Sequence, residues 1–436
     1  MKETHKASKS KINLLLLFVF CLQIIAMGAP IAGFMSHKLK MTDLASCILP
    51  LGFLYILISN RIDLKNAKNL WLVYAIIAVL QIMVFIKWGT GNILISVFYD
   101  VAAAFILART LGIRKFLWYF EHAVTVLTFI SLIFWLSVML FPGISNILRS
   151  IAFPPYTDNI DFTIGVFGRP NGEEHLHRNN GFAWEPGRFA SIIVLTMLIN
   201  LFRNKFRFNN RNFWILMAGL ISTFSTTGFM AFAVCIIGIS LNYKKSGMLK
   251  WTKYIIVGGF VMFLITSPFM YEKIILTSDS DKWLDEAGAT RRAEKGIEYT
   301  PQRLEGLFLE FLNVLDSPLI GYGENSDLSY VIRELFPFVE LHLSNGIFKI
   351  ASRLGIPLAI LFYICLWKSS CVLAQLYQVR GKYLFFLLII LINVSYNFFS
   401  EPLVIFISLC SIFISNKERT LIYRDYAPSV NCCSDL

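Results

Sequence analysis

The chain has 436 residues, of which 56% are hydrophobic and only 16% are charged, and the apolar residues come in long blocks. Such blocks exclude an ordinary soluble domain and are typical of an integral membrane protein. The formal charge of +12 does not indicate a nucleic-acid partner. In a protein with several membrane spans, excess lysine and arginine usually mark the cytoplasmic side.

Twelve apolar runs are candidate membrane spans, which predicts an all-α, polytopic membrane protein of about twelve transmembrane helices. The first run exceeds the roughly 7–15 apolar residues of a secretory signal, so we interpret it as a retained span. The runs are Ile12 to Phe34, Met41 to Ser59, Leu70 to Ile86, Ile93 to Ala108, Leu117 to Phe141, Gly181 to Phe202, Phe213 to Phe224, Phe229 to Asn242, Tyr254 to Met270, Asn345 to Trp367, Tyr383 to Phe399 and Leu403 to Ser415.

The basic residues between these runs set the expected topology. Most fall in connections on the side of the N-terminus, which the positive-inside rule makes cytoplasmic; Lys38, Lys40 and Lys87 are the exceptions. Both termini are therefore expected in the cytoplasm. The expected divisions are spans one to five in 1–141, a first long external loop in 142–180, spans six to nine in 181–270, a large external loop in 271–344, spans ten to twelve in 345–415 and a cytoplasmic tail in 416–436.

Two short apolar runs flank Ser225 to Gly228, STTG. They are either a helical hairpin or one broken span. Basic clusters precede the first run and follow the second, and two clusters on one side require an even number of crossings, which favours the hairpin. Thr226 and Thr227 are then expected only to shape its turn.

The large external loop is expected to contain a helix, because apolar residues recur at helical spacing between Leu304 and Leu315. This helix should lie on the outer membrane surface or against the bundle. Gly321 and Gly323 follow it and suit a tight turn near a ligand. No cysteine falls in either long external loop, and no metal-site spacing or phosphate-binding glycine loop is found, so neither metal nor nucleotide is expected.

Charged groups gather at Arg178 to Ala190, RNNGFAWEPGRFA, directly before an apolar run. Charges at the edge of a span are costly unless they have partners or a function. Two interpretations remain open for Arg178 and Arg188: they extend to lipid headgroups, with Glu185 paired to one of them, or they bind a ligand. Upstream, His175 and His177 are two residues apart and follow two glutamates, a pattern more typical of a solvated loop than of a metal site.

A second polar group follows the large loop. His342, Asn345, Lys349 and Arg353 are three, four and four residues apart and form one stripe on an expected helix. Such a stripe must face protein, water or anionic headgroups. Cations beside a titratable imidazole suit an anionic substrate with a nearby acid or base, although each residue alone would have an ordinary role.

Four segments in order resemble the O-antigen polymerase family, the repeat-unit polymerases of bacterial surface polysaccharides. They are RNNGFAWEPGRFA, STFSTTGFM at Ser222 to Met230, PQRLEGLFLEFLNVLDSPLIGYG at Pro301 to Gly323, and LHLSNGIFKIASRLGIP at Leu341 to Pro357. The resemblance implies a GT-C-like, lipid-linked glycosyltransferase architecture in the bacterial inner membrane. It implies transfer of a growing glycan from undecaprenyl diphosphate to the next lipid-linked repeat unit at the external face, without a cofactor.

The resemblance also implies site roles. Arg178, Arg188 and Arg303 match motif positions and are expected to bind diphosphate, with Lys349 and Arg353 as weaker candidates. Of the two acid–base candidates, His342 lies in the family's histidine-containing motif and is expected to deprotonate the acceptor hydroxyl. Glu185 is the competing base, or it only orients an arginine. The expected partners are undecaprenyl-diphosphate-linked oligosaccharides, membrane lipids, a chain-length regulator and a flippase.

Two departures and three alternatives stand beside this resemblance. The polar segment Arg169 to His177 has no counterpart in the family, and STTG lacks the arginine that related sequences often carry there. The alternatives are an O-antigen ligase of the same architecture, a flippase or exporter of lipid-linked sugars, and a non-catalytic scaffold. No internal repeat supports a transporter.

Overall fold

The computed structural model describes residues 68–89, 95–151, 160–164, 166–170, 177–183, 185–207, 209–242, 303–323, 346–399, 401–414, 418–420 and 422. Three expected spans, at 12–34, 41–59 and 254–270, lie outside the described residues, as does His342. The chain divides into two compact units. Described parts of the first unit are Ile106–Asn242 and Tyr377–Val379, and those of the second are 68–105, 303–376 and 380–422.

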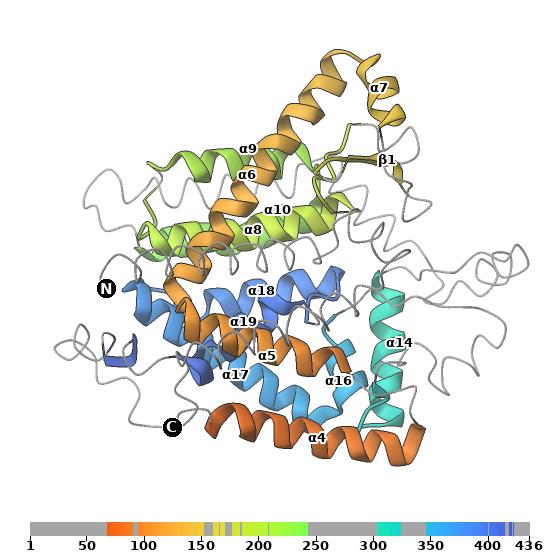
Figure 1. The fold of residues 1–436 in the computed structure, drawn as a ribbon, viewed down its shortest axis with the longest axis vertical. Coiled ribbons are helices and arrows are strands. Elements are labelled where there is room, and N and C mark those ends of the chain that lie inside the picture. Colours follow the sequence, from red (N-terminus) through yellow and green to blue (C-terminus); the bar gives the residue numbers. More distant parts are fainter. Residues whose placement is uncertain are drawn as a thin grey trace, which may run out of the picture. The chain divides into compact units, whose positions relative to one another are not determined.

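The described chain is mostly helical, as the hydropathy pattern predicts, and its only strands form one short antiparallel pair (Figure 1). Among the described residues, four helices are long and apolar enough to cross a membrane: α4 (Lys68–Trp88), α6 (Ile113–Leu140), α8 (Pro186–Arg203) and α17 (Ile356–Tyr377). The other described elements are α5 (Ile95–Thr110), α7 (Ile144–Ser150), β1 (Ile160–Thr163), β2 (Gly168–Pro170), α9 (Arg211–Ser222), α10 (Thr226–Asn242), α14 (Arg303–Asp316), α16 (Lys349–Leu354), α18 (Leu384–Ser395) and α19 (Pro402–Phe413).

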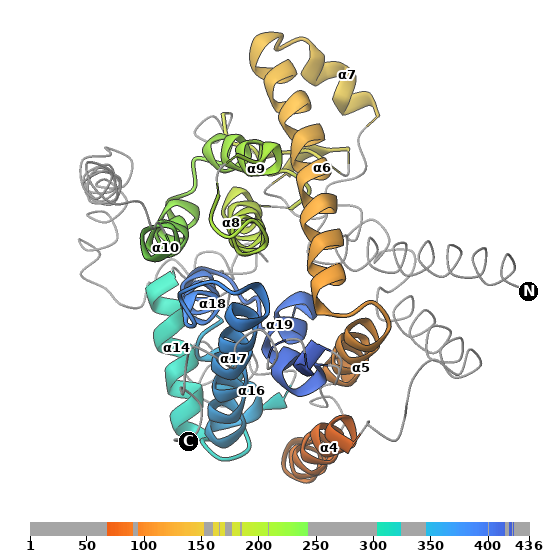
Figure 2. The ribbon, with the colours of Figure 1, turned by 90° about the vertical axis from the view of Figure 1, so that its left-hand side faces the viewer.

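Helix α8 is the centre of the first unit. It packs against α6, α9 and α10, and Figure 2 shows it enclosed by these three helices. In the apolar stretch of α8, 89% of the residues are buried, compared with 28% in the apolar stretch of α6, most of which is not buried. The expected run from Gly181 begins as a helix only at Pro186, because proline at the first helical position fixes the backbone there and lacks a donor to satisfy.

Helices α9 and α10 form the expected helical hairpin. Asn212 and Gly219 of α9 lie near Asn200 and Ile193 of α8, so these two helices are antiparallel. Gly228 and Cys235 of α10 lie near Ala190 and Val194, so α10 is parallel to α8. The turn is made by 223–225; Thr226 and Thr227, which were expected in the turn, already belong to α10.

In the second unit, the expected span from Asn345 to Trp367 is divided. The described part consists of the short helix α16 and the long helix α17, separated by Gly355. Gly355 has φ +79°, and an added Cβ would lie 2.3 Å from the carbonyl oxygen of Leu319. Only glycine fits this close approach at such a φ, so the polar residues before it are on a separate helix.

Helix α14 begins at Arg303 and confirms the helix expected in the large loop. It packs against α16 and α18 and runs across the direction of α4 and α17 (Figure 1). Its packed face differs from the apolar one that the spacing indicated. Phe311 and Leu315 are exposed, whereas the following residues are buried: Gly306, Leu309, Glu310, Asn313, Val314 and Ser317.

Candidate functional site

The turn before α8 is bound to the tip of the α9–α10 hairpin. The Arg178 guanidinium donates through Nε to the carbonyl oxygen of Thr223 at 3.1 Å. The Asn179 backbone N–H donates to the carbonyl oxygen of Ser222 at 2.9 Å, and the Asn179 side-chain Nδ2 donates to the Ser222 hydroxyl at 3.1 Å. Two of the sequence motifs are therefore joined in space, and the hairpin tip sets the position of Arg178.

Asn179 also connects the turn to α6. It is completely buried, and its Oδ1 accepts hydrogen bonds from the Ser131 hydroxyl at 2.7 Å and from the Gly181 backbone N–H at 2.8 Å. A buried amide with its donors and acceptors used in this way holds its neighbours in one arrangement. Asn179 therefore fixes α6, the hairpin and the arginine turn relative to each other.

Gly181 allows the turn to pack closely against α8. It has φ +56°, and an added Cβ would lie 2.3 Å from the ring of Phe189. Phe182 packs edge-on against the same ring, with centroids 5.2 Å apart. Glycine is required here both for the left-handed backbone and for the close approach.

The first turn of α8 carries two of the expected site residues. Glu185 is at the N-cap in an extended conformation, and its side chain does not cap the helix. Arg188 follows in the first turn and is only 8% exposed. A cation there is near the positive end of the helix dipole and loses hydration, so its burial is costly unless polar or anionic groups compensate it. Arg178, Glu185 and Arg188 therefore form one structured cationic turn in the first unit.

The segment expected to be the first long external loop is partly structured around this turn. The strands β1 and β2 form a hairpin, and the Gly168 N–H donates to the carbonyl oxygen of Gly181 at 3.0 Å. On α6, the Trp135 indole donates to the carbonyl oxygen of His177 at 3.0 Å. The His177 side chain is exposed, and His175 lies outside the described residues. Within the described chain, no group of three metal-ligating side chains is found.

Lys349 has a different environment from the one its sequence position suggested. It is 2% exposed, and its ammonium lies 3.0 Å from the Glu310 carboxylate, which is completely buried on α14. The Ser352 hydroxyl donates to the other oxygen of Glu310. The Glu310 carboxylate balances the charge of Lys349, and this ion pair argues against Lys349 as a diphosphate ligand.

Glu310 was not singled out from the sequence. Its signal was present, because Glu310 and Asn313 share one face of α14 at helical spacing, and Ser317 continues this spacing just after the helix. Small and polar residues on one face indicate close packing against another polar element. That element is α16.

The glycine turn after α14 packs against α16. Gly321 and Gly323 have φ values of +71° and +72°, as the expected tight turn requires. The Tyr322 N–H donates to the carbonyl oxygen of Ser352 at 2.7 Å. The Trp88 indole donates to the carbonyl oxygen of Gly321 at 2.9 Å, and its ring stacks on Tyr322. This turn therefore fixes the backbone that carries the half-buried Arg353.

The expected site residues thus fall in two groups. The first unit holds Arg178, Glu185 and Arg188, and the second holds Lys349 and Arg353. Arg303 is the first residue of α14, but its side chain lies outside the described residues, like all of His342. That these groups converge in one cavity stays a prediction.

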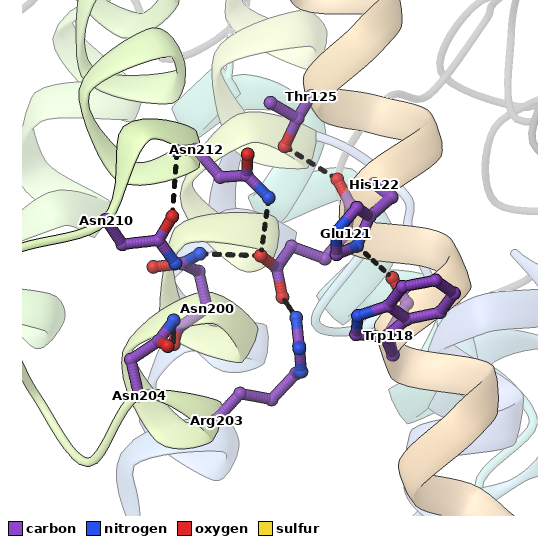
Figure 3. A network of polar contacts seen from close by, with 9 residues as sticks. All are labelled: Trp118, Glu121, His122, Thr125, Asn200, Arg203, Asn204, Asn210 and Asn212. Atoms are coloured by element: carbon purple, nitrogen blue, oxygen red, sulfur yellow. Dashed lines mark hydrogen bonds and ion pairs between the residues drawn. The ribbon is translucent and has the colours of Figure 1, made fainter.

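A buried polar network at the other end of the first unit was also missed from the sequence. Figure 3 shows Glu121 of α6, completely buried, at its centre. Its Oε1 accepts from the side-chain amides of Asn200 at 2.6 Å and Asn212 at 3.1 Å, and its Oε2 pairs with Arg203. Asn210 caps α9 through the Asn212 N–H. The network joins α6, α8 and α9 at the start of the basic connection between α8 and α9, which runs from Arg203 to Arg211.

Comparisons with known proteins add no relative: no family model, no curated protein and no solved structure matches the chain.

Proposed function

We propose that this protein is a repeat-unit polymerase of a bacterial surface polysaccharide, located in the inner membrane with both termini in the cytoplasm. It transfers a growing glycan from an undecaprenyl diphosphate carrier to the next lipid-linked repeat unit. The observation that carries the proposal is the cationic turn: Arg188 is buried in the first turn of α8, and Arg178 is held at the hairpin tip.

The chemistry of the turn suits a diphosphate. Guanidinium groups bind phosphate oxygens through two parallel hydrogen bonds, and buried ones do so with greater strength. In glycosyl transfer from a lipid diphosphate, the bond between the sugar and the diphosphate breaks while negative charge develops on the leaving diphosphate. Fixed cations that stabilise this developing charge lower the barrier. Arg178 and Arg188 would supply that stabilisation without having to reorganise.

The acceptor hydroxyl must lose its proton as its oxygen bonds to the transferred sugar. Glu185 precedes Arg188 by three residues, and its carboxylate does not cap α8, so we propose it as the group that accepts that proton. His342 is the alternative base. In the second unit, Arg353 remains a candidate for the second diphosphate, whereas the Glu310 ion pair removes Lys349 from that role.

The position of the turn supports an external reaction site. Arg178 and Arg188 lie at the end of α8 opposite Arg203, and Arg207 and Arg211 follow in the basic connection. By the positive-inside rule that connection is expected in the cytoplasm, which supports an external position for the turn. Polyprenyl diphosphates displayed on that side would then reach it with their headgroups.

The test is elongation in vitro by the purified full chain, using lipid-linked repeat units that are radiolabelled in the sugar. We expect products that increase by whole repeat units, and we expect Arg178→Lys and Arg188→Lys to lose most of this activity at equal expression. Transfer only to a lipid A core would identify a ligase instead. Transport of the lipid-linked units across proteoliposomes without elongation would contradict the proposal.

A further inference from the structure

A cavity of about 470 Å³ lies within the second unit, between α4, α5, α16, α17 and α19. Its size is in the range of about 300–1,000 Å³ that is usual for ligand pockets. Its walls are largely apolar, with Val73 and Ile76 from α4, Val101 from α5, Leu358 and Leu361 from α17, and Leu409 from α19.

The cavity has the dimensions of a single lipid chain. Its lining follows α17 from Leu358 to Lys368, a separation of ten residues. At about 1.5 Å per residue this is about 15 Å, which is half of the roughly 30 Å hydrocarbon core of a bilayer. With α17 along the membrane normal, the cavity would extend over about one leaflet.

Its charged lining differs between the two ends. At the α16 end are Lys349, whose charge is balanced by Glu310, and Arg353. At the other end are Lys368 and Arg419, both exposed. There Arg419 donates to the carbonyl oxygen of Ser411 at 3.3 Å, which holds it beside the end of α19.

The end with Lys368 and Arg419 is the cytoplasmic one by the distribution of basic residues. Helix α4 begins there with Lys68, and Asn69 donates to the carbonyl oxygen of Ile412 near the end of α19. Arg380 and Lys382 follow α17 on the same side. Anionic headgroups of the cytoplasmic leaflet attract such clusters.

We propose that this cavity binds one anionic phospholipid of the cytoplasmic leaflet. Its phosphate lies between Lys368 and Arg419, and one acyl chain occupies the apolar space along α4 and α17. The inference does not depend on the polymerase proposal, because the phosphate is at the opposite end from the side where the sugar carrier would react. The bound lipid would fill the space between α4 and α17 and stabilise the second unit.

Native mass spectrometry of the full chain in detergent tests the binding, with phosphatidylglycerol and phosphatidylcholine of equal chain length as probes. We expect one phosphatidylglycerol to be retained and phosphatidylcholine to be lost. Lys368→Gln combined with Arg419→Gln should weaken phosphatidylglycerol binding about 30-fold, as expected for two cations near an anionic headgroup. The control is Lys68→Gln, which removes a charge at the same end without altering the cavity lining.

A second pair of variants tests the acyl chain. Val73→Trp places a large ring in the cavity from α4 and should abolish lipid retention. Val79 is exposed on the same helix outside the cavity, so Val79→Trp should leave lipid retention unchanged. Unchanged thermal unfolding midpoints without added lipid would show that the variants are folded. Equal retention of both lipids, insensitivity to both Lys368/Arg419 and Val73, or loss of binding only with Arg353→Gln would overturn the proposal.

Discussion

The two units hold their cations in different ways. In the first, Arg178 is fixed by the carbonyl oxygen of Thr223, and the surrounding turn is held by the Asn179 amide. In the second, Lys349 is fixed by a buried carboxylate from another helix. A backbone carbonyl and a buried carboxylate both hold a cation in place, and the carboxylate also balances its charge. The variants below test whether the proposed diphosphate binds at the turn of the first unit.

The strongest test of this contrast is the loss of charge in the cationic turn. Arg188→Ala should reduce polymerisation in vitro by about 100-fold or more, because removal of one preorganised donor to a developing anion has effects of that order. Arg188→Lys should also lose activity, since lysine lacks the two-pronged donor arrangement. Arg211→Ala, an exposed position at the other end of the first unit, is the matched control and should be fully active. Wild-type activity in both Arg188 variants would remove the turn from the site.

In the second unit the corresponding test is of stability. Lys349→Met or Glu310→Gln alone should lower the free energy of unfolding by about 3–5 kcal/mol, because each leaves a buried charge without its counter-charge. The double variant should be more stable than either single one, as measured by thermal unfolding in detergent. If Lys349→Met left stability unchanged but abolished polymerisation, the lysine would belong to the substrate site after all.

The Glu121 network provides a contrast within the first unit, because it lies away from the turn. Glu121→Gln should destabilise the protein by about 2 kcal/mol, since Arg203 would lose its carboxylate and the buried amide bonds would weaken. The rate of elongation at saturating substrate should be unchanged. A stable but inactive Glu121→Gln variant would show that this end of the unit participates in the reaction.

The smallest expected effects come from two glycines around α14. An alanine at Gly321 would meet the Arg353 carbonyl oxygen at 2.6 Å and require an unfavourable φ, so Gly321→Ala should destabilise the protein by about 2 kcal/mol. Gly306 has open space at its Cβ position, so Gly306→Ala should stabilise the protein by up to about 1 kcal/mol. Unfolding midpoints of both variants measure this difference. Similar shifts of the same sign would show that α14 packs differently.

Hydropathy and charge predicted the helices that have long apolar runs and basic flanking residues. They indicated α4, α6, α17 and the hairpin of α9 and α10, because long apolar runs and basic flanks have direct physical causes. They did not separate α16 from α17. That division depends on the approach of Leu319 to Gly355, a contact between segments that periodicity within one run does not contain.

The candidate site was less predictable for the same reason. The arginines of the turn were apparent as charges next to a span, but the anchoring role of Asn179 depends on Ser131 and Ser222, which are distant in sequence. Lys349 was expected only as a weaker ligand candidate, and its ion-pair partner Glu310, which lies 39 positions earlier, was not apparent from the sequence. A single sequence shows which residues are costly to bury, and it does not show which other residue offsets that cost.

The enclosure of α8 has a consequence for biosynthesis. Its mean hydropathy of 1.2 is well below the 2.3 of α4 and α6, and it carries the polar residues Ser191, Thr196 and Asn200 along its buried length. A segment of this composition partitions weakly into lipid by itself. Stable integration of α8 during translation therefore requires α6, made before it, and α9 and α10, made after it. A ribosome stalled ahead of Arg211 leaves α8 without two of the three helices that pack against it.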